Sequence, residues 1–487
     1  IGSHLLTVGN AGLLMKHGSD KQKQVFAHQL YKGLWAGTMC LSEPQAGSSL
    51  SDIQTKATPD GDDFAADPLG PRYRLKGNKM WISSGDHELT QNIVHLVLAK
   101  VPGPDGKLIA GTRGISLFIV PKFNVSDDGQ VLDHNKVVCS AIEHKMGIHG
   151  NATCVLNFDG AQGYLIGPEN RGLNCMFTFM NTARIGTAVQ GLAASEISFQ
   201  GALSYATERL AMRSLSGPQY PDKNADPIIV HPAVRAMLMT QKAFSEGGRA
   251  LAYFLAQHVD IVESSNDQEQ QKHSDELLAF LTPIAKAFLT ESGNESAKHG
   301  VQVFGGHGFI VEHGMEQIIR DARISTLYEG TTEIQSLDLL ARKVLKSEGK
   351  LLKNMADLID QFIGQQQSNE VLKPYLEKLA ELKQQWLSLT KSIAEKAKHN
   401  PEEIGAASVD YLYFSSYVVF AYLWARMAQV AHEKLESSKQ EEVFYKAKLT
   451  TAKFFYQKLL HRTQSHAASI ESGADAVMEL DQDAFAF

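Results

Sequence analysis

Residues 320–335 read RDARISTLYEGTTEIQ and place one carboxylate, Glu329, between a tyrosine and a glycine. A helix-compatible segment precedes this carboxylate, and Ile334, Leu337 and Leu340 follow it at helical spacing. The pattern predicts a loop that ends one helix, exposes an acid to a cleft and begins another helix. Because acids in such positions are often structural, the local pattern alone leaves both a structural and a catalytic role open for Glu329.

Four other segments accompany YEGTTEIQ: LSEPQAGSS at residues 41–49, KGNKMWISSGD at 76–86, KMGIHGNATCVLNFDG at 145–160 and VQVFGGHGF at 301–309. In this order they resemble motifs of the acyl-CoA dehydrogenases, flavoproteins that desaturate acyl thioesters. The resemblance covers residues 1–345. Segments such as GTMCLSEP and ERLAMRSLSGP are most similar to those of the long bacterial branch with a C-terminal extension, which includes the 3-methylmercaptopropionyl-CoA dehydrogenases.

The composition of the 487-residue chain is that of an ordinary globular protein, with 43% hydrophobic and 21% charged residues. A net charge of −7 argues against a general nucleic-acid binder, and it requires any site for the polyanionic CoA to be locally basic. The widely spaced cysteines match no metal-binding pattern and predict free thiols in a reducing compartment. No His-Glu-x-x-His motif occurs, so no metal site is predicted.

Four segments differ in sequence pattern. Residues 1–35 read as two helices with Ser19 as a cap, and residues 36–165 alternate short apolar runs with turn residues, which is typical of an antiparallel β domain. Residues 166–345 have helical periodicity and form the predicted FAD-binding and catalytic domain, and residues 346–487 read as an appended helical bundle. The predicted fold class is therefore α+β: helical segments flanking a central antiparallel β domain, plus a helical extension.

The resemblance implies that residues 1–35 are the remnant of an N-terminal helical domain that is mostly absent. No signal peptide is visible. The longest apolar run, residues 411–425, is shorter than the roughly 20 residues of a membrane span and predicts a buried helix. We therefore expect no transmembrane segment and a location in the bacterial cytoplasm.

Desaturation between Cα and Cβ of an acyl thioester requires a base for the α-proton and an acceptor for the β-hydride. No side chain accepts hydride, and the resemblance implies that FAD does. It also implies that Glu329 is the base, with burial beside the acyl chain raising its pKa towards the working pH. The backbone N–H of Glu329 and a flavin hydroxyl are expected to donate to the thioester oxygen, with Gly330 and Ser48 at the substrate.

A subset of the family carries its base on an earlier helix, at the position that matches Arg184 in this chain. Arginine stays protonated and cannot act as a base, which favours Glu329. Arg184 is then expected to bind substrate or to orient the active site, and a structural ion pair is the alternative.

The resemblance also implies a set of cofactor contacts. Ser42 and Ser83 match positions that meet the isoalloxazine ring, and Trp81 offers a flat face to it, with a core tryptophan as the alternative. Arg209 matches an arginine that holds the FAD pyrophosphate, with an ordinary exposed arginine as the alternative. The expected cofactor-binding residues are Leu41, Ser42, Gly47, Ser48, Trp81, Ser83, Arg209, Gln302, Gly305, Gly306, Thr331 and Glu333, of which residues 302–306 are expected to serve a neighbouring subunit.

These expectations describe a FAD-dependent acyl-CoA dehydrogenase of fatty acid β-oxidation, which converts an acyl-CoA to the trans-2-enoyl-CoA and passes electrons to an electron-transfer flavoprotein. The alternatives are an acyl-CoA oxidase that uses O2, a flavin enzyme with a non-CoA substrate, and a non-catalytic flavin- or CoA-binding relative. A non-catalytic relative is expected to lose Glu329 or the flavin serines, and both are present. We expect a homodimer in which the extension covers the surface that a tetramer would use.

Overall fold

The computed structural model describes residues 2–437 and 440–486, and these form two compact units that meet at Gly186 and Thr187. The boundary lies inside helix α4 (Gly172–Glu208), so the first half of this helix belongs with the β domain and the second half with the helical unit. The terminal residues of two predicted segments, Ile1 and Phe487, lie outside the described residues. The finer division into four domains stays a prediction.

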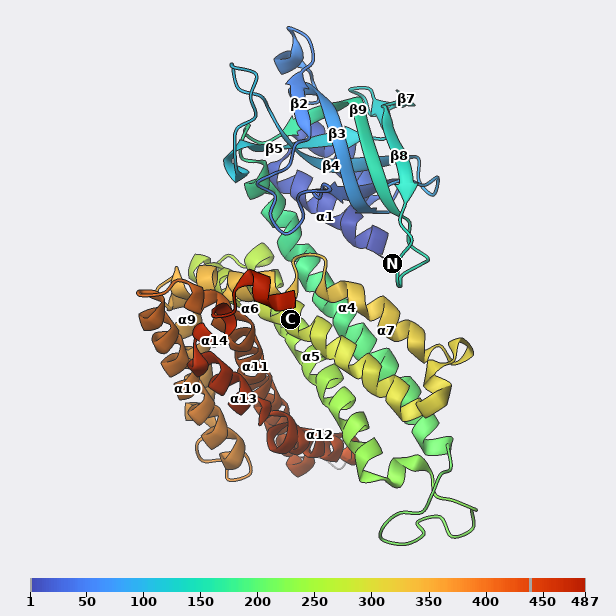
Figure 1. The fold of residues 1–487 in the computed structure, drawn as a ribbon, viewed down its shortest axis with the longest axis vertical. Coiled ribbons are helices and arrows are strands. Elements are labelled where there is room, and N and C mark those ends of the chain that lie inside the picture. Colours follow the sequence, from blue (N-terminus) through green and yellow to red (C-terminus); the bar gives the residue numbers. More distant parts are fainter. Residues whose placement is uncertain (1, 438–439, 487) are drawn as a thin grey trace. The chain divides into compact units, whose positions relative to one another are not determined.

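The first unit begins with helices α1 (Gly2–His17), α2 (Asp20–Gln22) and α3 (His28–Tyr31). Ser19 caps α2 as predicted: its hydroxyl accepts from the Gln22 N–H at 3.2 Å, and the Gln22 side chain accepts from the Ser19 N–H at 3.0 Å. The buried Asn10 amide of α1 donates to the Thr38 carbonyl at 3.1 Å and to the Val94 carbonyl at 2.9 Å. These bonds fix α1 against the sheet (Figure 1).

The sheet of this unit has strand order β1-β4-β2-β3-β9-β5, with β8 paired to β9, and it closes because β4 also pairs with β5. Most pairings are antiparallel, as predicted, but β1 runs parallel to β4, with Trp35 opposite Asn92 and Cys40 opposite Val97. The intervening chain contains β2 and β3, which allows β4 to re-enter the sheet in the direction of β1. The strands are β1 (Trp35–Cys40), β2 (Lys56–Pro59), β3 (Arg72–Ser83), β4 (Asn92–Lys100), β5 (Ile115–Pro121), β8 (Val137–Ile142) and β9 (Thr153–Ile166), and β6 (Phe123–Val125) forms a separate hairpin with β7 (Val131–His134).

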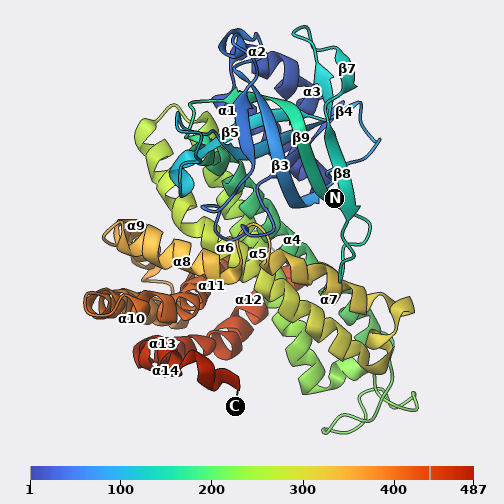
Figure 2. The same ribbon diagram turned by 45° about the horizontal axis from the view of Figure 1, so that its top comes forward.

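The second unit is helical. Its long helices α5 (Pro232–Ser264) and α6 (Gln268–Phe304) lie side by side in both views, followed by α7 (Met315–Arg323) and α8 (Thr332–Leu337), which continues as a π-helical turn, Asp338–Leu345 (Figures 1 and 2). The extension consists of α9 (Lys350–Gln366), α10 (Lys373–Ala397), α11 (Glu402–Ser437), α12 (Glu442–Phe454), α13 (Arg462–Ser472) and α14 (Asp475–Met478). Within the extension, a π-helical turn, Phe455–Leu459, follows α12 and directs Phe455, Tyr456 and Leu459 into the core.

The extension shares one hydrophobic core with the preceding helices. Phe288 of α6, Leu340 of the π-helical turn and Trp386, Phe420 and Trp424 of the extension belong to the same buried cluster. In the described part of the chain, α11 is the one helix long and apolar enough to cross a membrane by length and composition. Since 67% of its most apolar window is buried inside the protein, α11 is a core helix here, as residues 411–425 predicted.

Candidate active site

Glu329 lies in the loop between a short 3-10 turn, Ile324–Thr326, and α8, as the sequence predicts. Its side chain is half-buried. Its backbone has a φ of 57°, in the left-handed region, and Gly330 follows with a φ of 89°. A non-glycine residue is costly in this region and persists there when its surroundings hold it. The surrounding structure must therefore stabilise the loop around Glu329 in this conformation.

Two buried side chains hold the carbonyl groups of this loop. The Lys286 ammonium of α6 donates to the Gly330 carbonyl oxygen at 2.6 Å. The Gln335 amide of α8 donates to the Glu329 carbonyl oxygen at 2.8 Å and to the Gly330 carbonyl oxygen at 3.3 Å. Both donors are fully buried, where a hydrogen bond is shielded from competition by water. They fix the peptide groups on both sides of Gly330.

The residues after the carboxylate anchor the loop to neighbouring helices. Thr331 caps α8, and its hydroxyl accepts from the Ile334 N–H. The Thr332 hydroxyl donates to the Glu291 carboxylate of α6 at 2.7 Å. One helical turn further, Ser336 contacts Ser408 of α11 at 3.0 Å. The position of the Glu329 loop therefore depends on α6 and on the extension.

Tyr328 precedes the carboxylate and does not compete with it as a base. Burial, together with the nearby Glu329 carboxylate, raises the pKa of Tyr328 to about 12. The phenol therefore stays protonated at neutral pH, and it donates a hydrogen bond to the Gln190 side chain of α4. This contact fixes the loop on its amino side.

In the first unit, the two segments expected to contact flavin converge. The Met80 N–H donates to the Ser42 carbonyl at 3.0 Å, and a Cβ at Gly47 would lie 3.9 Å from the Trp81 ring. Trp81 sits in a register shift of the β3–β9 pairing, with a φ of 61° and 55% of its surface exposed. It is not a core tryptophan. The bulge presents its ring to the outside.

A buried ion pair holds these two segments together. The Lys79 ammonium lies 2.7 Å from a Glu43 carboxylate oxygen and donates to the Leu41 carbonyl at 3.0 Å. The Glu43 carboxylate also accepts from the Gln54 N–H at 2.7 Å and from the Thr55 hydroxyl at 2.6 Å. Burial opposes ionisation of Glu43, but Lys79 and these hydrogen bonds hold the pKa of this carboxyl below its usual range.

The other expected FAD-binding residues gather at the far end of α6. The Tyr205 ring of α4 stacks on Phe304 with centroids 4.1 Å apart, and its hydroxyl lies 2.8 Å from a ring nitrogen of His307. This brings the exposed Arg209 near exposed Gln302, Gly305 and Gly306. Since Gln302 lies about 24 Å along α6 from Lys286, this group is remote from the Glu329 loop of its own subunit.

The structure thus groups the expected residues in three places. Leu41, Ser42, Gly47, Ser48, Trp81 and Ser83 lie on the first unit; Glu329, Gly330, Thr331 and Glu333 lie on one loop of the second; Arg209, Gln302, Gly305 and Gly306 lie at the far end of α6. Arg184 is buried on the first half of α4. In residues 2–437 and 440–486, no cluster of His, Cys, Asp and Glu is suited to a metal ion.

Sequence reasoning missed Glu43, Lys79, Lys286 and Gln335 as determinants of the site. For Lys286 the signal is its position as the one charged residue in the apolar run LTPIAKAFLT. A lysine placed in such a run is either exposed or recruited to a specific buried acceptor, and Lys286 is the latter. Glu43 and Lys79 lie within the quoted motifs, but their pairing depends on contact between separate segments.

Protein-family comparisons match the same segments. The acyl-CoA dehydrogenase middle domain matches residues 38–161, the acyl-CoA dehydrogenase C-terminal domain matches residues 170–345, and the acetyl-CoA dehydrogenase C-terminal-like family matches residues 351–481. The 3-methylmercaptopropionyl-CoA dehydrogenase of Ruegeria pomeroyi is 38% identical over 97% of this chain and 78% of its own length. The chain belongs to the acyl-CoA dehydrogenase family. A butyryl-CoA dehydrogenase of Syntrophomonas wolfei is 31% identical over 99% of this dehydrogenase and 78% of its own length.

Solved structures confirm the predicted fold class. Caenorhabditis elegans ACDH-11 in complex with C11-CoA has a TM-score of 0.80 and 20% identity, covering 99% of this chain and 76% of that one. An FAD complex of an acyl-CoA dehydrogenase from Bacillus anthracis has a TM-score of 0.73 and 22% identity, covering 94% and 73%. A structure described as an electron transferring flavoprotein of Acidaminococcus fermentans has a TM-score of 0.52 and 25% identity, covering 68% and 73%.

These findings confirm the predicted class of enzyme. The protein is an oxidoreductase that carries out FAD-dependent dehydrogenation of acyl-CoA thioesters. Its observed surface fits a flavin, because a bulge presents an exposed aromatic face next to Gly47, which adds no side chain beside that face.

Proposed function

We propose that Glu329 abstracts the α-proton of the acyl thioester. The observation that carries this assignment is the left-handed backbone of Glu329, held by the buried Lys286 and Gln335 side chains. A general base must keep one position relative to the proton that it removes, and small displacements are costly. The fixed loop gives the carboxylate such a position.

The backbone near the base has a second role in this proposal. The Glu329 N–H donates to the thioester oxygen and stabilises the enolate charge that develops there, while Gly330 leaves room for the thioester to approach. Lys286 and Gln335 act indirectly, because they orient the peptide groups and do not contact the substrate. Bound FAD supplies the hydride acceptor that no side chain can provide.

Two groups of residues are proposed to hold FAD. Trp81, Ser42 and Ser83 of the first unit suit the flavin ring, because they offer a flat face and polar groups. The exposed Arg209 and the segment Gln302–Gly306 suit the phosphates and adenosine of FAD. The proposed FAD contacts on the first unit also include Leu41, Gly47 and Ser48. Those on the second unit also include Gly305, Thr331 and Glu333. Arg184 and Ser48 are proposed substrate contacts.

Gln302 lies far along α6 from Lys286, which contacts the Glu329 loop, and Arg209 lies near Gln302, so we propose that both serve the FAD of a second subunit in a homodimer. Each subunit of a two-fold dimer can then complete the other's site. We further propose a cytoplasmic enzyme of fatty acid β-oxidation that reduces an electron-transfer flavoprotein. The similarity to the Acidaminococcus fermentans structure supports this electron acceptor.

The acceptor proposal is tested by turnover of purified holoenzyme with acyl-CoAs of varied chain length, using electron-transfer flavoprotein and then O2. We expect rapid turnover with the flavoprotein and slow turnover in air, since bound product excludes oxygen from the site. Stoichiometric peroxide formed at the full rate of turnover would instead assign the protein to the acyl-CoA oxidases. Absence of turnover with every acyl-CoA would favour a non-catalytic relative.

A further inference from the structure

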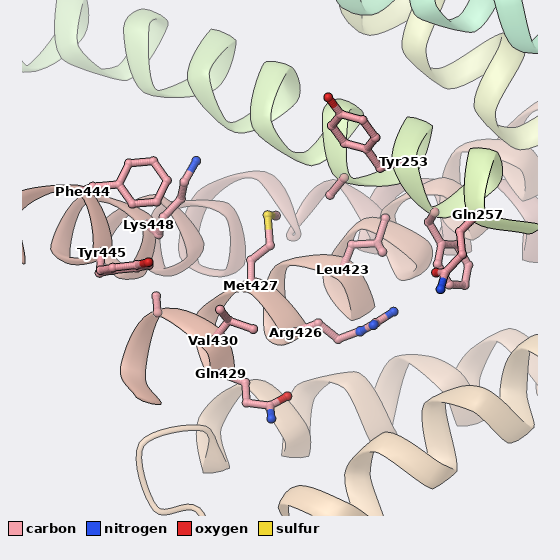
Figure 3. Close-up of a pocket in the computed structure, with 13 residues that line it drawn as sticks. Tyr253, Gln257, Leu423, Arg426, Met427, Gln429, Val430, Phe444, Tyr445 and Lys448 are labelled. Atoms are coloured by element: carbon pink, nitrogen blue, oxygen red, sulfur yellow. The ribbon is translucent and has the colours of Figure 1, made fainter. Parts of the chain in front are cut away.

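A surface groove in the second unit shares no residue with the site described above. It lies between α5, α11 and α12 and has a volume of about 590 Å³. Figure 3 shows its side chains. This volume falls within the range of about 300–1,000 Å³ that is typical of small-molecule sites.

The floor and rim of the groove are apolar. Leu423, Met427 and Val430 recur on one face of α11, which extends the floor over about 10 Å. On the rim, Tyr253 is 71% exposed and Phe444 is 51% exposed. Contiguous exposed apolar side chains around a hollow are characteristic of a binding surface.

Two cations line the groove, and they differ in their partners. The Lys448 ammonium lies 3.0 Å from the Glu246 carboxylate, which also pairs with Lys242 at 2.6 Å. The Arg426 guanidinium lies over the rings of Phe254 and Tyr422, at 5.7 Å and 5.5 Å from their centroids, and no carboxylate pairs with it in the described part of the chain. The groove therefore has an apolar body and a positive end at Arg426.

We propose that this groove binds a free fatty carboxylate. A planar guanidinium can donate to both oxygens of a carboxylate, which suits Arg426 to a ligand with a carboxylate head. Gln257 lies one turn beyond Phe254 on α5, and Figure 3 shows its amide at the same end of the groove as Arg426. The carboxylate binds there, and the acyl chain lies over Met427 towards Phe444.

The test uses calorimetric titration of the holoenzyme with three probes. Dodecanoate has the head and the tail, dodecanol has the tail alone and acetate has the head alone. We expect dodecanoate to bind at least tenfold more tightly than either of the others. Equal binding of dodecanoate and dodecanol would overturn the proposal, because Arg426 would then contribute nothing. Failure of dodecanoate to bind would overturn it too.

Variants then locate the binding. Arg426→Gln should weaken dodecanoate binding at least tenfold, and Val430→Trp should block the groove, while acyl-CoA turnover stays unchanged in both. Arg235→Gln, which removes an exposed arginine about 33 Å along α5 from Gln257, is the matched control and should bind normally. Wild-type affinity in Arg426→Gln would place the ligand elsewhere. A change in oligomer mass in either groove variant would show an interface between subunits instead.

Discussion

At Glu329, a residue with a side chain adopts a backbone conformation that costs roughly 1–2 kcal/mol relative to the common regions. The cost is offset locally, because the carbonyl groups on both sides of Gly330 accept hydrogen bonds from buried donors. The same bonds would have to be broken for the loop to relax. These hydrogen bonds therefore hold the backbone that carries the Glu329 carboxylate.

Lys286→Met should reduce the rate of α-proton abstraction while the protein stays folded. The substitution keeps most of the buried volume and removes the shorter of the two hydrogen bonds to the Gly330 carbonyl. Because a displacement of about 1 Å can cost around 100-fold in rate, we expect a loss of 10- to 100-fold. Single-turnover kinetics under anaerobic conditions, with FAD content measured in parallel, check this.

Lys272→Met is the control, since Lys272 is exposed on the same helix. It should react at the wild-type rate. A wild-type rate in Lys286→Met would show that the loop keeps its geometry without this hydrogen bond. Loss of FAD with no change in rate per bound flavin would assign Lys286 to cofactor retention instead.

Among the elements, α6 connects the base loop with the extension. The Arg462 guanidinium of α13 lies 2.9 Å and 2.6 Å from the two Glu295 carboxylate oxygens of α6. Burial opposes ionisation of Glu295, but hydrogen bonds from His299 and Arg462 hold its pKa at about 2. One helical turn earlier, Glu291 accepts from Thr332 of the base loop. The Arg462–Glu295 ion pair therefore stabilises α6, the helix that holds the Glu329 loop.

Glu295→Gln should lower the free energy of unfolding at pH 7 by about 2 kcal/mol, because Arg462 loses its charged partner and keeps its hydrogen bond to the Tyr417 hydroxyl. The pKa of Glu295 is depressed in the folded state, so its stabilisation is complete above the ordinary value of 4.5 and is lost as the pH falls towards 2. The wild-type and variant Tm should therefore converge on acidification. Thermal unfolding across this pH range measures it.

Glu395→Gln removes an exposed carboxylate from a pair with Lys398 and is the matched control. Its Tm should equal that of the wild type at every pH. A pH-independent difference for Glu295→Gln would mean that its packing, and not its charge, carries the effect.

The accuracy of sequence reasoning also differs by element. Long periodic helices such as α5 and α11 could be predicted, because each carries a wide apolar face through many turns. The break after α12 could not, since Phe455 and Leu459 fit a continuous helix as well as a π-helical turn. The parallel pairing of β1 with β4 could not be predicted either, because alternation of apolar residues does not specify strand direction.

For the site, motif positions could be predicted but not the contacts that support them. Glu329 and Trp81 stand out within short quoted segments. The Lys79–Glu43 pair and the Lys286–Gly330 contact join residues far apart in the sequence. Such pairings arise only when the fold brings two segments together.

At the scale of the whole molecule, the extension and the catalytic helices are one folding unit. Leu281 and Phe288 of α6 share their hydrophobic cluster with Trp386 and Trp424 of the extension. The extension therefore covers apolar surface of its own chain, which is consistent with the capping role that the sequence suggested. The homodimer itself stays a prediction.

Deleting residues 346–487 should cause aggregation, because the apolar faces of α6 and α8 would be exposed. Deleting only residues 473–487, which lie beyond α13, is the control and should leave a folded protein. Light scattering on the intact chain should give twice the 53.5 kDa chain mass. A tetrameric intact protein, or a soluble dimer after the longer deletion, would refute the capping role.

The most direct test of the account is the rate of α-proton abstraction in Glu329→Gln. The variant keeps the shape of the side chain and removes the base, so FAD content and acyl-CoA binding should match the wild type. Proton abstraction, followed as anaerobic flavin bleaching by acyl-CoA, should fall by at least the factor of about 10² to 10⁴ that general-base catalysis contributes. Glu263→Gln, at an exposed site near the end of α5, should bleach at the wild-type rate. Bleaching of Glu329→Gln at the wild-type rate would contradict the assignment of the base.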